Sequence, residues 1–115
     1  MKETTTAGGQ KKFKYEGSLQ KGFTFYFPKS HVEVPSSVFT AVLENFSKQS
    51  EVVGGFERNS PPEEGIGYFV WQFTKNNLPK TVLPLNGTHI VAILRDENLV
   101  TVKTVGVKVL VDFLV

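Results

Sequence analysis

The valine-rich stretch near the end of the chain restricts the fold more than any other feature of the sequence. Between Val100 and Phe113, apolar and polar residues alternate in two runs that meet at Gly106. Alternation of period two predicts strands with one apolar face, and a glycine between two such runs predicts a tight hairpin. A two-residue turn at Val105-Gly106 brings the apolar faces together; the predicted partners are then Thr104 with Val107, Val102 with Val109, and Val100 with Val111.

Two lysines face each other in this predicted register. Lys103 and Lys108 lie on the opposite face of the hairpin from the valines, directly across from one another. Like charges in that position destabilise a hairpin, and an anion such as a phosphate between them would remove the cost. The alternative is that both side chains simply extend into water. The pair is therefore a candidate anion-binding site.

The segment before the hairpin is predicted to be a helix over 86–96. Asn86 can cap its first turn, and apolar residues between Ile90 and Leu94 share one face. A strand interpretation stays open, because 89–94 and 99–104 could instead pair with each other as a hairpin.

Two earlier helices are predicted from their start signals. Pro35-Ser36-Ser37 precedes apolar residues at helical spacing, which predicts a serine-capped helix over 36–49. Ser60-Pro61 followed by two glutamates predicts a helix over 61–76, with a strand over 51–57 before it. The second helix is ambiguous, because each of its two glycines costs about 1 kcal/mol and its aromatic residues also suit a strand.

The beginning of the chain is predicted to contain a tail and one aromatic strand. Residues 1–12 have no bulky apolar side chain after the first methionine, which predicts a disordered tail before a single α+β domain over 13–115. Phe23, Phe25 and Phe27 alternate with polar residues or tyrosine and predict a strand with one aromatic face, followed by a short strand at 31–34. This pattern also resembles the base-stacking strand of cold-shock and RRM proteins, although a buried strand face is the preferred interpretation.

Charge is distributed unevenly along the chain, although its net value is only +2. Residues 1–30 carry six lysines and two glutamates, and residues 31–65 carry two basic and six acidic residues. A fold of such a chain could present one positive face to a polyanion, and Lys11 and Lys12 in the tail would belong to that face. The alternative is that a lysine-rich tail only improves solvation.

No constellation of catalytic or metal-binding residues is recognisable in the sequence. The 115 residues include no cysteine and only two histidines, His31 and His89, neither of which lies in a hydrolase or metal-ligand pattern. We therefore expect no enzyme, no catalytic residue, no metal and no cofactor. No apolar run reaches the roughly 20 residues of a membrane span and no secretory signal is present, so we expect a cytoplasmic, intracellular protein.

The expected order of elements resembles that of the winged helix-turn-helix superfamily. The resemblance consists of a helix, a strand, two helices and a hairpin over residues 36–114, and of the step from Ile93-Leu94 into Asn98-Leu99-Val100. It implies a winged-helix-like α+β fold with three helices, a C-terminal β-hairpin and extra N-terminal strands. By the same resemblance the last helix would be the recognition helix, with Lys103 and Lys108 on the wing. The implied DNA contacts on or beside that helix are Thr88, His89 and Arg95.

Two functional hypotheses follow from these patterns. The first is a non-enzymatic nucleic-acid-binding domain of winged-helix type, with duplex DNA as its ligand. Its candidate binding residues are Lys103, Lys108, Thr88, His89, Arg95, Lys11 and Lys12. The second is a protein-interaction or structural module without a nucleic-acid role, which forms a homodimer or binds a protein partner through the free edge of its C-terminal strand, 107–115.

Overall fold

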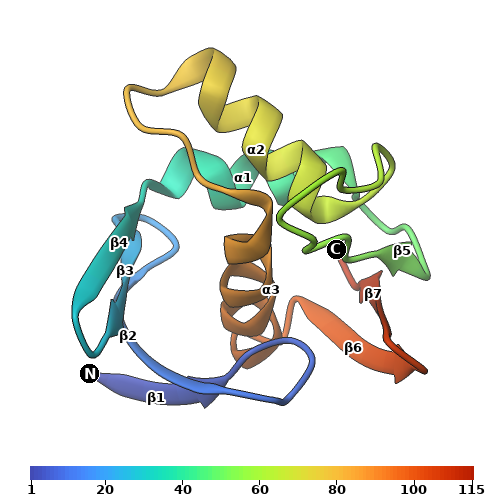
Figure 1. Ribbon diagram of the computed structural model, residues 1–115, viewed down its shortest axis with the longest axis horizontal. Coiled ribbons are helices and arrows are strands. Elements are labelled where there is room, and N and C mark those ends of the chain that lie inside the picture. Colours follow the sequence, from blue (N-terminus) through green and yellow to red (C-terminus); the bar gives the residue numbers. More distant parts are fainter.

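Helix α3 (Gly87–Asp96) stands in the middle of the molecule, with the other elements around it (Figure 1). The computed structural model describes residues 1–115. One antiparallel sheet lies on one side of α3 and a second sheet on the other, while two helices cover its upper end in the view of Figure 1. Seven of the ten residues of α3 are buried. The fold is thus an α+β domain built around one enclosed helix.

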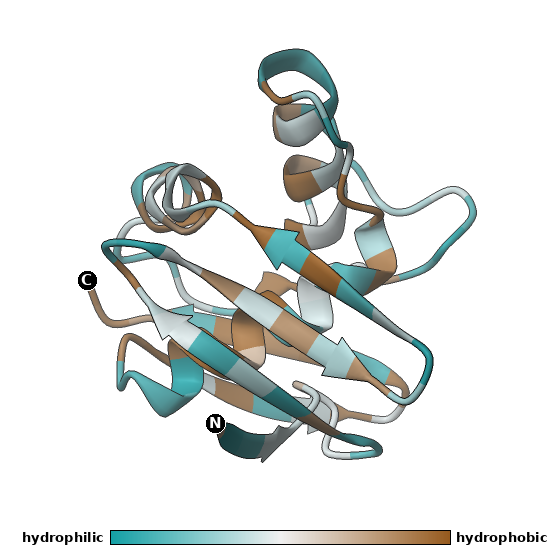
Figure 2. Cartoon of the chain, turned by 90° about the vertical axis from the view of Figure 1, so that its left-hand side faces the viewer, coloured by the Kyte–Doolittle hydropathy of each residue, from teal (hydrophilic) through white to brown (hydrophobic).

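The first sheet is a meander in which strands pair in chain order, β1-β2-β3-β4. Its strands are β1 (Lys2–Thr5), β2 (Lys12–Ser18), β3 (Gly22–Phe27) and β4 (Ser30–Val34). Brown and teal alternate along the strands in Figure 2, as a sheet with one buried face requires. Phe23 and Phe25 are 3% and 0% exposed. The predicted aromatic strand is confirmed, and these two rings belong to the core, where they cannot stack on bases.

The prediction of a disordered tail over 1–12 is wrong. Residues Lys2–Thr5 form β1, which pairs antiparallel with the first half of β2. The strand has no bulky apolar residue, so its order comes from backbone pairing and from polar contacts with α3 rather than from its own burial.

All three predicted helices are confirmed, but their ends differ. They are α1 (Ser36–Asn45), α2 (Ile66–Asn77) and α3, which follows a short 3-10 turn, η1 (Pro84–Asn86). No side chain makes a capping hydrogen bond at the start of any of them. The predicted caps are therefore wrong, and α2 begins five residues later than its apparent start signal indicates.

The second sheet contains the predicted hairpin, in a different register. Its strands β5 (Val52–Val53), β6 (Val100–Val105) and β7 (Lys108–Phe113) lie in the order β5-β7-β6. The turn is Gly106-Val107, and Gly106 has a φ of +62° at the first central position, where a type II′ turn favours glycine. The observed pairs include Thr104 with Val109, Val102 with Val111 and Val100 with Phe113.

The register shift separates the two wing lysines. Lys103 lies opposite Leu110, and Lys108 lies opposite Val105. The prediction of two directly opposed lysines is therefore wrong. The shift is by two residues, so each side chain stays on the face that the alternation predicts.

The C-terminal strand has no free edge. β7 lies between β6 and β5. The two-residue strand β5 covers only the middle of β7, and backbone groups on either side of β5 bond the rest of that edge. Gly54 donates to the carbonyl of Val109 at 2.8 Å, and Phe113 donates to the carbonyl of Gln49 at 2.8 Å. The hypothesis of partner pairing through this strand therefore lacks the edge it needs, and β6 is the edge of the sheet. None of the helices has the length and apolar character needed to cross a membrane.

Candidate functional site: the groove beside helix α3

A groove lies where the β1–β2 loop, the start of α3 and the β6–β7 hairpin meet. It has a volume of about 610 Å³, and we call it the α3 groove. One part of its lining is apolar and consists of Phe27, Phe56, Leu85, Val107 and Val109. The other part is polar or small and consists of Thr6, Gly8, Gln10, Lys11, Asn86, Thr88 and His89. The lining thus contains one lysine and no carboxylate.

The β1–β2 loop is fixed against the start of α3. The backbone N–H of Ala7 donates to the hydroxyl oxygen of Thr88 at 3.0 Å, and Thr6 and Lys11 bond through their backbones at 2.8 Å. Gly9 allows the turn with a φ of +74°. These contacts hold the backbone of Lys11 beside α3, so a residue predicted to lie in a tail is a wall of the groove.

Phe56 is a part of the groove that the sequence did not indicate. The ring is half-buried, and a Cβ added to Gly87 would lie 2.9 Å from it. Close packing of the ring on the start of α3 thus depends on glycine at position 87. The glycine pair Gly54-Gly55 does predict a close backbone approach, but not the ring that occupies it.

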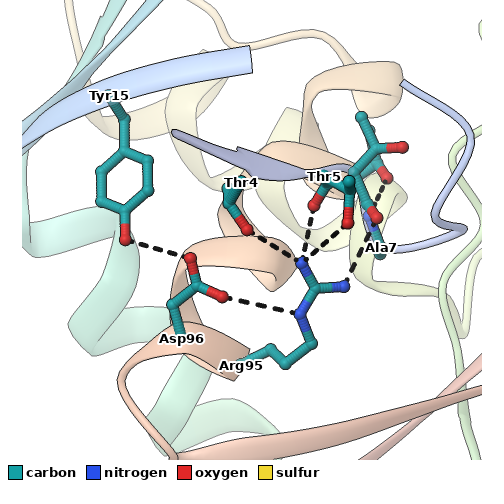
Figure 3. A network of polar contacts seen from close by, with 8 residues as sticks. Thr4, Thr5, Ala7, Tyr15, Arg95 and Asp96 are labelled. Atoms are coloured by element: carbon teal, nitrogen blue, oxygen red, sulfur yellow. Dashed lines mark hydrogen bonds and ion pairs between the residues drawn. The ribbon is translucent and has the colours of Figure 1, made fainter. Parts of the chain in front are cut away.

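Arg95 holds the N-terminal strand in place (Figure 3). Its guanidinium donates to the carbonyl oxygens of Thr5 at 2.7 Å and of Thr6 at 3.4 Å, and to the hydroxyl of Thr4 at 3.2 Å. Asp96 lies 3.7 Å from its Nε. The guanidinium that was predicted to contact DNA is thus engaged within the protein, by β1 and the loop after it.

Asp96 extends the same network to the first sheet. The hydroxyl of Tyr15 donates to its carboxylate at 3.1 Å (Figure 3). Burial raises the pKa of Tyr15 to about 12, with a further contribution from the negative charge of Asp96. The phenol therefore stays protonated and serves as a hydrogen-bond donor.

Replacing Arg95 with alanine is expected to loosen β1 and to lower the free energy of unfolding by about 1–2 kcal/mol, because the carbonyls of Thr5 and Thr6 lose a charged donor. Hydrogen exchange of the β1 amides should become faster than that of β3. Arg95→Lys is the matched control. It should lose less stability than the alanine variant, because lysine keeps the positive charge but not the planar set of N–H donors of the guanidinium. Unchanged β1 protection in the alanine variant would contradict this role.

His89 is a core residue that also lines the groove. It is 8% exposed, and its ring centroid lies 4.7 Å from that of Phe13 and 5.1 Å from that of Phe27. Burial lowers the pKa of His89 to about 4; a hydrogen bond with the backbone of Asn86 opposes this shift, and the positive charge of Lys11 adds to it. The ring is therefore neutral at neutral pH.

The remaining predicted site residues lie on outer faces. Lys103 and Lys108 lie on the face of the second sheet that points away from α3, and Lys103 forms an ion pair with Glu51 at 3.3 Å. Lys12 is exposed on the outer face of the first sheet, opposite Thr5. Of the seven predicted residues, the structure brings only Lys11, Thr88 and His89 together.

Helix α3 itself cannot enter a DNA groove in the manner of a recognition helix. Residues on every side of it are buried, including Gly87, His89 and the whole run from Ile90 to Leu94. Any ligand at this place must therefore contact the loops and the groove at its start. No group of three or more His, Asp or Glu side chains is placed to hold a metal ion.

Comparison of the chain with known protein families, with curated proteins and with solved structures finds no match.

Proposed function

We propose that the protein is a non-enzymatic nucleic-acid-binding domain of winged-helix type that uses the α3 groove and its two flanking loops, not the face of α3. The order α1, β5, α2, α3, β6, β7 supports the winged-helix part of this proposal, and the first sheet is an N-terminal addition.

The absence of carboxylates from the groove lining is the observation that carries the proposal. Lys11 is the single charged residue of the lining, and Lys12 and Lys108, the first residues of β2 and β7, adjoin lining residues in the chain but lie on the outer faces of the two sheets. All three lysines are exposed. A lysine in an acid-free groove, with two more lysines on the adjacent sheet faces, suits a phosphate backbone, which supplies most of the affinity in nucleic-acid binding.

Charge reversal of these three lysines is expected to weaken binding roughly ten-fold or more. Fluorescence anisotropy with labelled single-stranded and duplex oligonucleotides of about 20 residues measures this, at about 50 mM and about 200 mM salt. Binding of the unmodified protein should weaken steeply as salt rises, and the variant carrying K11E, K12E and K108E should lose most of that salt dependence.

The variant carrying K21E, K29E and K80E is the matched control. These three lysines are also exposed, but none of them lines the α3 groove or adjoins a lining residue in the chain, and the change in net charge is the same. It should retain most of the affinity. Equal losses in both variants would show that only net charge matters, and no binding at about 50 mM salt would refute the proposed function.

A further inference from the structure

Helix α2 holds two of its aromatic side chains outside the hydrophobic core. The buried residues of the helix are Ile66, Gly67, Val70 and Thr74. Phe69 and Phe73 are half-buried and pack against the core. Tyr68 and Trp71 are also half-buried but do not belong to it, and in Figure 1 the helix lies along the upper outside of the molecule. Since tyrosine and tryptophan are enriched at the energetic centres of protein interfaces, this side of α2 has the composition of an interface.

The two rings belong to an ordered row of side chains, Tyr68, Trp71 and Lys75, which we call the α2 stripe. Spacings of three and four residues place its members along one side of the helix. The ring centroids of Tyr68 and Trp71 are 6.0 Å apart, and Nζ of Lys75 lies 5.6 Å from the ring centroid of Trp71. Glu63 and Glu64 precede the helix and border the same surface as Tyr68. The surface is therefore acidic at its first end, aromatic in its middle and basic at its last end.

The α2 stripe lies between two grooves. One groove, of about 680 Å³, is bounded by the loop before α2 and by Leu83, and Tyr68 and Trp71 both line it. The other, of about 390 Å³, is bounded by the end of α1 and is lined by Tyr68 and Gln72. A row of side chains flanked by grooves is the surface with which one helix packs against another.

The charges of this surface complement a second copy of the same surface. Glu63, Glu64 and Lys75 are exposed, and both ion pairs within the protein involve other residues. When two α2 helices lie antiparallel, the acidic end of each meets the basic end of the other, and the aromatic rings meet in the middle. The helix dipoles are then antiparallel as well, which is their favourable orientation. A nucleic acid suits the surface less, because its phosphates would lie against the two glutamates.

We propose that the α2 stripe binds the α2 stripe of a second copy of this chain in a two-fold symmetric dimer. Tyr68 and Trp71 form its centre, and the two glutamates of each copy face the partner's Lys75. A two-fold interface uses the same patch on both subunits, which is what a self-complementary surface provides. The 12 residues of α2 span only about 18 Å, so the interface is small and its dissociation constant is about 10–100 µM.

The test is sedimentation velocity of the whole chain, without nucleic acid, from about 5 µM to about 500 µM. The mass should rise with concentration from 12.8 kDa toward twice that value. Trp71→Ala should raise the dissociation constant about ten-fold or more, because it removes a ring from the centre of the interface. Circular dichroism of this variant shows whether it is folded.

Exchanging the charges tests the antiparallel arrangement without removing a ring. K75E places carboxylates opposite one another, and the double variant E63K/E64K does the same with lysines, so each alone should dimerise several-fold more weakly. An equimolar mixture of the two variants should dimerise again, because opposite charges then meet at both ends of the interface. K29E is the matched control: Lys29 is exposed in the turn between β3 and β4, the net charge changes as in K75E, and the dimer should persist.

Three results overturn the inference. The first is a mass of 12.8 kDa at every concentration. The second is a dimer that neither Trp71→Ala nor the charge variants weaken, and the third is a mixture of the charge variants that stays monomeric. If the protein is monomeric and Trp71→Ala loses oligonucleotide binding, the stripe belongs to the nucleic-acid site instead. No member of the stripe lines the α3 groove, so failure of this test leaves the proposed function standing.

Discussion

Replacing Gly67 with alanine is expected to destabilise the protein by about 3 kcal/mol, although alanine is normally the better helix residue. Gly67 is the second residue of α2 and donates its N–H to the carbonyl of Gly54 at 2.8 Å. An alanine Cβ at this position would collide with the carbonyl oxygen of Gly55 and lie 3.0 Å from that of Pro84. Because both contacts are backbone atoms, α2 must move away from its neighbours.

Urea unfolding followed by the fluorescence of Trp71, the single tryptophan, measures the effect. Gly8→Ala is the matched control. A Cβ at Gly8 would meet only the side chain of Val109, at 3.8 Å, and should change the free energy of unfolding by less than about 0.5 kcal/mol. An alanine at position 67 that leaves stability equal or higher would show that the close approach of α2 is not required.

The same contacts explain why the sequence misplaced the start of α2. Ser60-Pro61 and the glutamates after it have the composition of a helix start, yet the helix begins at Ile66 after Gly65. The two glycines, which seemed to argue against a helix, are accepted because backbone from 54–55 and Pro84 packs directly on them. Apolar spacing therefore predicts that a helix exists, while tertiary contacts decide where it begins.

The hairpin shows a second limit of sequence reasoning. A period of two determines which side chains share a face, and the structure confirms the apolar faces of β6 and β7. The period of two does not distinguish registers that differ by two residues, because every side chain stays on the same face in both registers. The conformation of Gly106 selected the register, and the predicted opposition of Lys103 and Lys108 was lost with it.

Long-range contacts account for most of what the sequence missed in the candidate site. Arg95 looked like a base-reading residue because its partners, Thr4 to Thr6, are about ninety positions away in the chain. Those partners in turn looked disordered because they are small and polar. Lys11 was predicted to be a binding residue from its charge alone. It lies beside Thr88 because the β1–β2 loop, which was predicted to be disordered, is fixed against the start of α3.

Lowering the pH from 7 to 4 is expected to cost the unmodified protein about 2–3 kcal/mol of stability that a His89→Phe variant does not lose, because burial lowers the pKa of His89 to about 4 in the folded state. In the unfolded chain the pKa of a histidine is about 6.5. Between these values the unfolded state binds a proton that the folded state excludes. The stability that the protein gains by keeping His89 neutral is therefore fully present above pH 6.5 and is lost as the pH falls toward 4.

The groups around His89 make this residue the source of the effect. Phe13, Phe25 and Phe27 surround its ring and do not titrate, and the positive charge of Lys11 further lowers the pKa of His89. Urea unfolding of both proteins at pH 7 and pH 4 measures the difference, which cancels contributions from the carboxylates that they share. His31→Phe is the control and should follow the unmodified protein, since His31 is exposed. If His89→Phe instead loses as much stability as the unmodified protein, then the imidazole of His89 can be protonated within the fold, and the aromatic enclosure does not keep it neutral.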